Sequence, residues 1–494
     1  VWDSATNRFA LVDKDGNKVF SENDKNVPKN ASVWKIVDSK ESAESEGAYS
    51  VYLKNGVTAD SLTVKTGIDV GNNTVSSLTY NGGDSAKEVI IRTNGATNIS
   101  VNAELDTVYH YGKAGGVNVI KCAMNSYHEH GEINGEIVVS EGHVSIEEGA
   151  VVLQPIVVKN TTKAVKVSAK EVVTVVVDST ADKGVEIESD KNIYVDDNSN
   201  GNNVTKPSNA ITPVEINSEA SFVNKEEFKI LETAGMTDGQ ANVLNGYYKL
   251  TADITVEHLL YVKQNTVAVI DLNGHSINSR FAGFVFGNWG TLTINDTKNG
   301  EGCVYNSSTS ASNGNFGHDA IRNFGLLTIN AGRFGDKTED RTDKNDCNYG
   351  AAVRNQADGV CIINGGAFSC VDNYGKWDNG KSSYSYAIRN YGQMTINNAT
   401  VYGKMNGCIA ADGGHIDING GNFSLNGTNT YYVAANSSGT MTINGGIFTR
   451  SDNDKLFGGF NGMPSWNAID SLLANGFVVN GGTFSVNGSE IIIK

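Results

Sequence analysis

The chain has 494 residues, with 55 glycines, 5 prolines and a formal net charge of -16 at pH 7. A single globular core does not reach this length, so we expect several domains or one elongated array. The negative charge disfavours nucleic acid and anionic lipid surfaces as partners, and no apolar run approaches the roughly 20 residues that cross a bilayer.

Residues 1–48 are predicted to form a small β-rich unit, and residues 49–195 a first β-solenoid. In the first segment, Phe9–Val12 and Val19–Phe20 flank the turn Asp15–Asn17, a pattern typical of a β-hairpin. In the second segment, short strands rich in valine and isoleucine follow one another at close intervals. Such a repeat predicts coils that stack around one continuous core.

A tyrosine-histidine phrase recurs within the first solenoid. Tyr109-His110 returns nearly one coil length later as Tyr127-His128, so we expect the two histidines to stack. The cluster is predicted to be either a metal site or a surface ladder without metal. The cluster also includes His130 and His143, and Glu129 or Glu141 would complete the metal shell.

Residues 196–214 are polar, rich in asparagine and hold two of the five prolines, which predicts a linker. Beyond it, Asn224 and Glu227 match a capping box and Gly235 matches a helix stop, so one short helix is predicted. We expect this helix to cover the open end of a second solenoid over residues 215–494.

The second solenoid is predicted from a strand phrase that ends in asparagine and recurs seven times, often followed by Gly-Gly-x-Phe. Because equivalent residues of successive coils lie above one another, we expect two asparagine or aspartate columns with hydrogen bonds between the amides along each column, and phenylalanines stacked inside. The repeated asparagines are Asn295, Asn330, Asn364, Asn397, Asn419, Asn444 and Asn480. The phenylalanine column consists of Phe334, Phe368, Phe423, Phe448 and Phe484.

The six cysteines contain no CxxC motif and show no spacing of a disulfide framework. Cys361 falls on an inward position of a repeated strand, so it is predicted to be a small core residue. Cys347 and Cys370 lie in neighbouring loops, where they either pair or remain thiols.

Three successive coils carry an arginine directly before a second repeated asparagine: Arg322, Arg354 and Arg389. Strand alternation points these side chains outward, so we expect one column of three arginines. Like charges at the ~4.8 Å spacing of strands repel each other unless another group compensates them. In neighbouring coils the same position is predicted to hold Gly287, Ala411 and Ala435.

The same coils contain the longest loops, which are rich in aspartate and aromatic residues. Guanidinium groups bind carboxylates through paired hydrogen bonds and flat rings cover sugar faces, so the pattern indicates a site for an acidic or neutral glycan. The alternative is a surface ion network in which loop aspartates neutralise the arginines. Beside the three arginines, the candidate ligand-binding residues are Asp319, Tyr349, Trp377, Tyr384 and Tyr386.

The segment Ile270–Ile277, the repeated coils and the asparagine columns resemble proteins of the pectate-lyase-like superfamily, and among them the large repetitive surface proteins of Gram-positive gut bacteria. The resemblance implies an all-β, right-handed parallel β-helix in two solenoid segments, and an extracellular protein that is secreted or displayed on the cell surface. This superfamily includes polysaccharide lyases, hydrolases, phage tailspikes and adhesins without catalytic activity. The resemblance therefore indicates the fold and leaves the function open.

The residues on the repeated strands do not indicate catalysis. A lyase of this superfamily needs an arginine or lysine base beside a sugar carboxylate, usually held by calcium on clustered aspartates, and a hydrolase needs two or three carboxylates on one face. The outward position of the repeated strand holds one carboxylate, Asp417, in six coils. Asp412 is predicted to be a structural corner residue. No catalytic residue, cofactor or specific calcium motif is therefore predicted.

We expect a non-catalytic extracellular adhesin that binds carbohydrate or a host-surface glycoprotein through the arginine column and its loops. The alternative is a polysaccharide-degrading β-helix enzyme, either a lyase or a glycoside hydrolase, or a phage tailspike with its site on the same face. Neither nucleic acid nor a membrane is expected as a partner.

Overall fold

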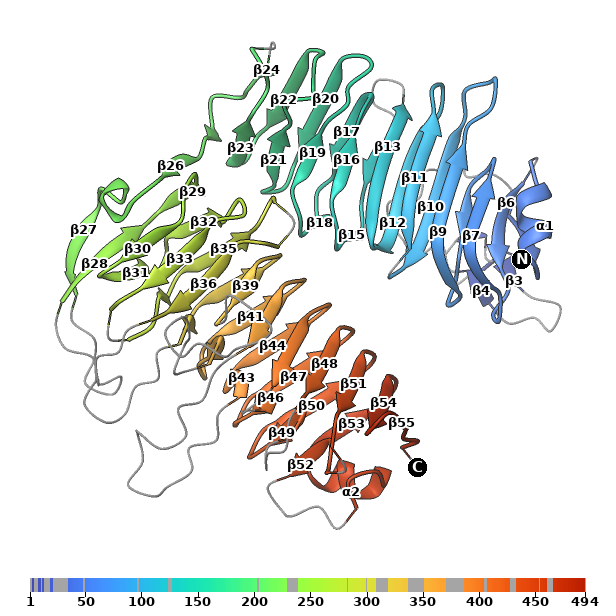
Figure 1. Cartoon of the computed structure of the whole chain (residues 1–494). Coiled ribbons are helices and arrows are strands. Elements are labelled where there is room, and N and C mark those ends of the chain that lie inside the picture. Colours follow the sequence, from blue (N-terminus) through green and yellow to red (C-terminus); the bar gives the residue numbers. More distant parts are fainter. Residues whose placement is uncertain are drawn as a thin grey trace. The chain divides into compact units, whose positions relative to one another are not determined.

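Both parts of the chain are built from parallel β-strands that stack coil upon coil, which confirms the predicted all-β solenoid fold (Figure 1). The chain divides into two compact units, Val1–Thr212 and Pro213–Lys494. The computed structural model describes residues 2–3, 8–9, 11–12, 18–20, 34–47, 49–95, 97–122, 127–201, 204–228, 239–281, 283–298, 300–307, 319–335, 351–369, 386–403, 407–426, 432–452, 454–459 and 465–493.

The first unit winds between two parallel sheets, here called the wide sheet and the narrow sheet. The path of the wide sheet is β5 (Trp34–Val37), β6 (Ser50–Leu53), β8 (Ile68–Asp69), β10 (Glu88–Asn94), β12 (Thr107–Ala114), β14 (Tyr127–Glu129), β17 (Gly142–Ile146), β20 (Val165–Ala169), β22 (Val185–Ser189) and β24 (Val204–Thr205), with β15 (Glu132–Ile133) and β18 (Val151–Val152) beside it. The narrow sheet contains β7 (Thr58–Val64), β9 (Thr74–Asn81), β11 (Asn98–Ala103), β13 (Gly116–Cys122), β16 (Ile137–Val139), β19 (Ile156–Val158), β21 (Thr174–Val177), β23 (Ile193–Asp197) and β25 (Ala210–Ile211).

The last part of the predicted N-terminal unit, from residue 34 onward, belongs to the first solenoid. The predicted hairpin is present, because β3 (Leu11–Val12) pairs antiparallel with β4 (Lys18–Phe20), and β1 (Trp2–Asp3) pairs antiparallel with β2 (Arg8–Phe9). From residue 34 onward, however, β5 pairs in parallel with β6. Helix α1 (Lys40–Ser45) buries Ala43 in the solenoid core, so it covers one end of the stack.

Part of the predicted linker, residues 196–214, also belongs to the first solenoid. Strand β24 pairs with β22, and β25 pairs with β23, both in parallel. Val204 and Ala210 pack against the core cluster of this unit. These two-residue strands are the last ones of their sheets, so little edge backbone is left open to pairing, and the division between units falls after Thr212.

The second unit winds through three sheets, here named the asparagine, arginine and phenylalanine sheets after their repeated residues. The asparagine sheet contains β26 (Val214–Ile216), β29 (Gly246–Leu250), β32 (Val267–Asp271), β35 (Thr291–Asn295), β38 (Leu326–Ile329), β41 (Val360–Ile363), β44 (Gln393–Ile396), β47 (His415–Ile418), β50 (Thr440–Ile443) and β53 (Phe477–Val479). The arginine sheet contains β27 (Lys225–Phe228), β28 (Gly239–Leu244), β31 (Leu259–Val262), β34 (Phe286–Asn288), β37 (Ile321–Asn323), β40 (Val353–Asn355), β43 (Tyr386–Asn390), β46 (Gly407–Ala411), β49 (Ala434–Asn436) and β52 (Phe457–Gly459). The phenylalanine sheet contains β30 (Ile254–Val256), β33 (Ser276–Ser279), β36 (Cys303–Asn306), β39 (Arg333–Phe334), β42 (Ala367–Ser369), β45 (Thr400–Gly403), β48 (Asn422–Leu425), β51 (Ile447–Arg450), β54 (Thr483–Val486) and β55 (Ser489–Glu490).

The start of the helix predicted after Asn224 is a strand. Residues of β27 pair antiparallel with β28, so the capping-box residue Glu227 lies opposite Gln240. Residues 229–238, which complete the predicted helix, lie outside the described residues. A short 3-10 turn (Glu219–Ser221) precedes β27, and helix α2 (Ile469–Ala474) buries Leu472 in the core of the second unit.

Two asparagine columns run through the second unit in opposite directions. In the asparagine sheet, each amide from Asn330 to Asn480 donates to the asparagine one coil earlier, over 2.8 to 3.0 Å. In the arginine sheet, Asn288, Asn323 and Asn355 each donate to the asparagine one coil later, over 2.7 Å. The predicted side-chain ladder is thus present in two copies of opposite polarity.

The phenylalanine column is also present, with Val401 in place of one ring. The ring centroids of Phe334 and Phe368 lie 5.2 Å apart, and those of Phe423 and Phe448 lie 4.7 Å apart. Cys361 is fully buried and free, as predicted, and burial raises the pKa of its thiol. The predicted partners Cys347 and Cys370 lie outside the described residues.

Candidate functional site

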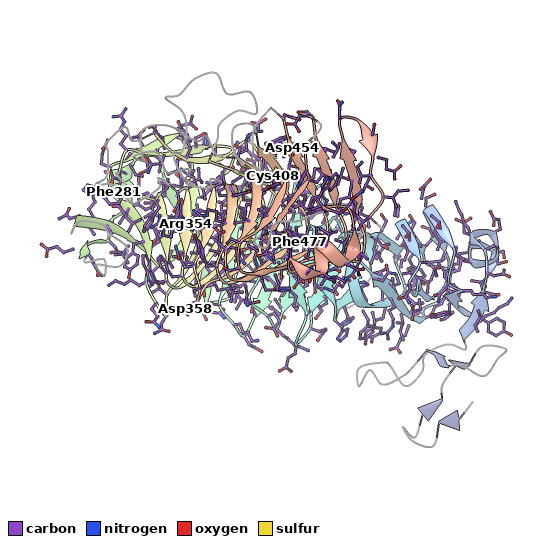
Figure 2. The ribbon with its side chains drawn as sticks, turned by 90° about the horizontal axis from the view of Figure 1, so that it is seen from below. Phe281, Arg354, Asp358, Cys408, Asp454 and Phe477 are labelled. Atoms are coloured by element: carbon purple, nitrogen blue, oxygen red, sulfur yellow. The ribbon has the colours of Figure 1, made fainter. Side chains whose placement is uncertain are left out.

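The three arginines form a column on the outward side of the arginine sheet. Arg322 pairs in register with Arg354, and Arg354 with Arg389, in the parallel strands β37, β40 and β43. Arg354 is labelled within this part of the chain in Figure 2. The side chain of Arg322 is buried, whereas those of Arg354 and Arg389 are each 20% exposed.

In one of the coils that flank the arginines, the residue in the arginine column is shifted by one position from the predicted residue. Gly287 and Ala435 lie in the column as expected, but Arg389 pairs with Ala410, and Ala411 lies where the other coils have asparagine. Asp412, which was predicted to be a corner residue, follows the column instead. The coil of Ala410 has Ala411 in place of the corner asparagine. The prediction therefore assigned the next residue, Asp412, to the corner position.

Asp319 connects the first two arginines. Its Oδ2 accepts hydrogen bonds from Arg322 Nε at 2.9 Å and from Arg322 Nη2 at 2.5 Å, and its Oδ1 accepts one from Arg354 Nη2 at 3.2 Å. The carboxylate is fully buried, and it also accepts the backbone N–H of Ala351. Burial alone would raise the pKa of Asp319, but the guanidinium groups of Arg354 and Arg322 hold it below its ordinary value.

Arg389 has a different set of partners. Its Nε donates to Asp412 Oδ2 at 2.7 Å, and its Nη2 donates to the hydroxyl of Tyr391 at 2.6 Å. Burial lowers the pKa of Arg389, but Asp412 and Tyr391 more than offset this and raise it above the ordinary value. Two aspartates therefore compensate part of the charge of the three arginines, as in the ion network that the sequence left as an alternative.

A second column of side chains, which the sequence analysis missed, runs beside the arginines. Trp289, Phe324, Gln356 and Tyr391 each directly follow the repeated asparagine of the arginine sheet. Backbone hydrogen bonds from Phe324, Gln356 and Tyr391 to the preceding coil keep them in register. The rings of Trp289 and Phe324 stack at 4.3 Å. The sequence contains a signal for this column, because the residue after each corner asparagine is aromatic in three of these four coils.

The predicted aromatic residues of the loops contribute less to the described surface. Tyr386 is 3% exposed, and its ring lies against Gly407, where an added Cβ would meet a ring carbon at 1.9 Å. It therefore packs inside the structure and offers no ring face to a ligand. Tyr349, Trp377 and Tyr384 lie outside the described residues.

The histidine cluster of the first unit is arranged differently from the prediction. The register pairs Tyr109 with His128 and His110 with Glu129, so His110 does not stack on His128. A shift of one residue sends a side chain to the opposite face of a sheet. His110 and Glu129 are fully buried, with Nδ1 to Oε1 at 2.8 Å, and His128 lies on the outer face against Glu147 at 2.7 Å. Within the described part of the chain, no three His, Cys, Asp or Glu side chains are placed to hold a metal ion.

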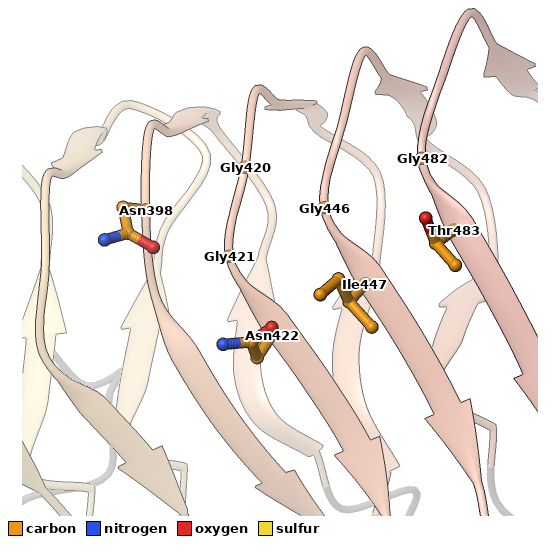
Figure 3. A pocket seen from close by; sticks show the side chains of 8 residues that line it. All are labelled: Asn398, Gly420, Gly421, Asn422, Gly446, Ile447, Gly482 and Thr483. Atoms are coloured by element: carbon orange, nitrogen blue, oxygen red, sulfur yellow. The ribbon is translucent and has the colours of Figure 1, made fainter. Parts of the chain in front are cut away.

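A shallow groove lies at the corner between the asparagine and phenylalanine sheets, away from the arginine sheet (Figure 3). It has a volume of about 440 Å³, and the glycine turns form its floor because they carry no side chains. The residues that line it are Asn398, Gly420, Gly421, Asn422, Gly446, Ile447, Gly482 and Thr483. None of these side chains is ionisable, so the charged groups considered above all lie elsewhere.

No protein-family model, no curated protein and no solved structure matches the chain. In the part of the chain that the structure describes, no helix has the length and apolar character needed to cross a membrane. The fold and the side chains of the arginine sheet therefore carry the functional argument.

Proposed function

We propose that this chain is a non-catalytic extracellular adhesin that binds a glycan, or a glycoprotein of a host surface, through the arginine sheet of its second unit. The binding surface, here called the arginine surface, consists of Trp289, Arg354, Gln356, Arg389 and Tyr391. All five side chains are partly exposed. The extracellular location is part of the proposal, and the resemblance of the repeated sequence phrases to bacterial surface proteins supports it.

The observation that carries this proposal is the pairing of two columns on one rigid sheet. Arg354 and Arg389 supply guanidinium donors, Gln356 supplies an amide, and Trp289 and Tyr391 supply aromatic groups within a few coils. Sugars present hydroxyl groups together with apolar ring faces, so their recognition needs these kinds of side chain in one place. A sheet positions them more rigidly than loops do.

The carboxylates beside this surface support binding in preference to catalysis. Glycoside hydrolysis needs a proton donor and a second carboxylate on one face. Asp319 is fully buried and accepts hydrogen bonds from two arginines, and Asp412 accepts one from Arg389. These contacts suit charge compensation better than proton transfer.

The test is a glycan array followed by titration of the best ligand. We expect Tyr391→Ala and Trp289→Ala to weaken binding by up to about tenfold each, since an aromatic contact contributes about 0.5–1.5 kcal/mol. The matched control is Tyr402→Ala, a partly exposed aromatic residue on the phenylalanine sheet, which should bind like the wild type.

Two results would contradict the proposal. If both variants bind as tightly as the wild type, the arginine surface is not the site. If acidic polysaccharides yield unsaturated sugars or new reducing ends, and Arg354→Ala abolishes this turnover, the protein is a polysaccharide-degrading enzyme.

A further inference from the structure

We infer that the ligand of the arginine surface carries an anionic group, a carboxylate or a sulfate, and that Arg354 binds it. This inference rests on the proposed function and narrows its ligand from glycans in general to acidic glycans.

The first observation in favour of an anionic ligand concerns the charges of the arginine column. The three arginines of the column face two carboxylates, Asp319 and Asp412, in the described ion pairs. One positive charge is therefore not balanced by these partners. The groups are largely removed from water, with side-chain exposures between 0% and 20%. A charge in such a place is stabilised most by an opposite charge, because little water is present to solvate it.

The second observation concerns which of the three guanidinium groups still has N–H groups available for a ligand. Arg322 directs both Nε and Nη2 to Asp319, and its guanidinium lies 4.7 Å from the ring centroid of Phe284. Arg389 is held by Asp412 and by the hydroxyl of Tyr391. Both guanidinium groups are thus fixed by neighbouring side chains, and both serve to build the surface.

Arg354 is less completely bonded. It shares Asp319 with Arg322, and its Nη2 hydrogen bond is the longest of the three guanidinium hydrogen bonds to that carboxylate, at 3.2 Å. Its Nε lies 2.9 Å from Asp319 Oδ2 but makes no hydrogen bond there, although it is buried. Among the described residues, the Arg354 guanidinium makes one hydrogen bond, whereas those of Arg322 and Arg389 make two each, so Arg354 has the most N–H groups left for a ligand oxygen.

The neighbours of Arg354 determine what kind of anion fits. Gln356 follows two residues later on the outer side of the same coil, and Tyr391 lies beside it one coil further along. A planar guanidinium binds a carboxylate or sulfate through two parallel hydrogen bonds. The amide and the hydroxyl would then meet neutral hydroxyl groups. This combination fits a uronic acid or a sulfated sugar within a glycan chain.

The experiment compares three polysaccharides by isothermal titration: hyaluronan, which carries carboxylates, dextran sulfate, which carries sulfates, and uncharged dextran. We expect at least one of the two anionic polymers to bind, with an affinity that falls as salt is raised, and dextran to bind at least tenfold more weakly. Whichever anionic polymer binds better identifies the anionic group to which Arg354 donates.

Variants of Arg354 then test whether this residue binds the anionic group. Arg354→Gln should weaken binding of the anionic polymer about tenfold or more, because hydrogen bonds to charged groups are the strongest ones lost. Arg354→Lys keeps the charge without the planar pair of donors, so it should lie between Arg354→Gln and the wild type. The control is Arg280→Gln, which changes an exposed arginine of the same unit that faces Glu257 at 3.7 Å. Thermal unfolding of each variant separates loss of binding from loss of fold.

The outcomes distinguish the two proposals. Equal binding of dextran and the anionic polymers, lost in Tyr391→Ala, would overturn the anion inference and leave the proposed function in place. Anionic binding that Arg354→Gln and Arg354→Lys leave unchanged would also overturn it. Binding of no glycan, either here or on the array, would overturn the proposed function itself.

Discussion

At the scale of single residues, the arginine surface depends on a buried carboxylate, Asp319, which accepts a hydrogen bond from Arg354. It is the shared acceptor for Arg322 and Arg354, and both guanidinium groups keep their positions through it. Neutralising such a group leaves two positive charges next to each other in a place with little water. The residue thereby links the stability of the sheet to the geometry of Arg322 and Arg354.

We predict that Asp319→Asn lowers the free energy of unfolding by about 3–5 kcal/mol, the usual cost of breaking a buried ion pair. Because the two arginines hold the pKa of Asp319 below its ordinary value, its contribution is complete above the unfolded pKa and is lost as pH falls through the folded pKa. Urea denaturation at neutral pH measures the effect. The matched control is Asp358→Asn, an exposed residue just beyond β40, and an equal effect in both variants would refute the assignment.

His143 in the first unit gives a second prediction at this scale. Burial, followed by the nearby Lys166, lowers its pKa from 6.5 to about 4, so the fold favours the neutral imidazole. The unfolded chain therefore binds more protons between these values, and stability is complete above pH 6.5 and is lost as pH falls towards 4. His143→Gln should flatten this pH dependence. Denaturation midpoints at pH 5 and pH 7 test it, with His415→Gln as control, and an unchanged slope would contradict the prediction.

At the scale of structural elements, the column of the asparagine sheet reaches the surface in its last coils, whereas the column of the arginine sheet stays buried. Asn355 is fully buried, and its Nδ2 donates to Asn390 Oδ1 at 2.7 Å. Its own Oδ1 accepts from Asn323. Asn444, in the other column, donates to Asn419 at 3.0 Å near the surface, where water can replace the lost partner.

We predict that Asn355→Ala costs about 1–3 kcal/mol of stability for each buried partner left without a hydrogen bond. Asn444→Ala should cost about 0.5–1.5 kcal/mol, the net value of an ordinary hydrogen bond. The two variants are compared by urea denaturation. A larger loss for Asn444→Ala would show that burial does not govern the strength of these columns.

Elements also show what could be predicted from the sequence. The repeated Asn-Gly-Gly-x-Phe phrase predicted the stacked coils, because each coil must place the same residues at its corners. The errors were shifts of one residue at His128 and at Ala410. A shift of this size barely changes the apparent repeat, yet it decides which side of the sheet a residue occupies. The capping box at Asn224 and Glu227 is a local signal, whereas the observed strand β27 depends on pairing with β28 from farther along the chain.

The candidate site could be predicted only in part, because a repeated phrase shows which residues recur but not what they contact. The arginine column followed from a repeated phrase, but its contacts with Asp319 and Asp412 depend on the path of each coil. The aromatic column containing Trp289 and Tyr391 was present in the repeat and was overlooked. Tyr386 was expected to be exposed, but the glycine opposite it, Gly407, leaves room for its ring to be buried.

At the scale of the whole molecule, the two units fill their elongated cores with different residues. The first unit fills the space between two sheets with valine and isoleucine, and it encloses the His110–Glu129 pair. The second unit uses three sheets, with stacked phenylalanines inside and asparagine columns at two corners. In both units each coil makes its contacts mainly with the coils before and after it.

The two asparagine columns have a consequence for how such a protein changes in length. Every amide within a column needs only one donor below and one acceptor above, so an additional turn of the same design would inherit both partners at once. Duplication or deletion of whole turns can therefore lengthen or shorten the array while every junction keeps the same chemistry, and evolution can alter the reach of the protein without rebuilding its interior.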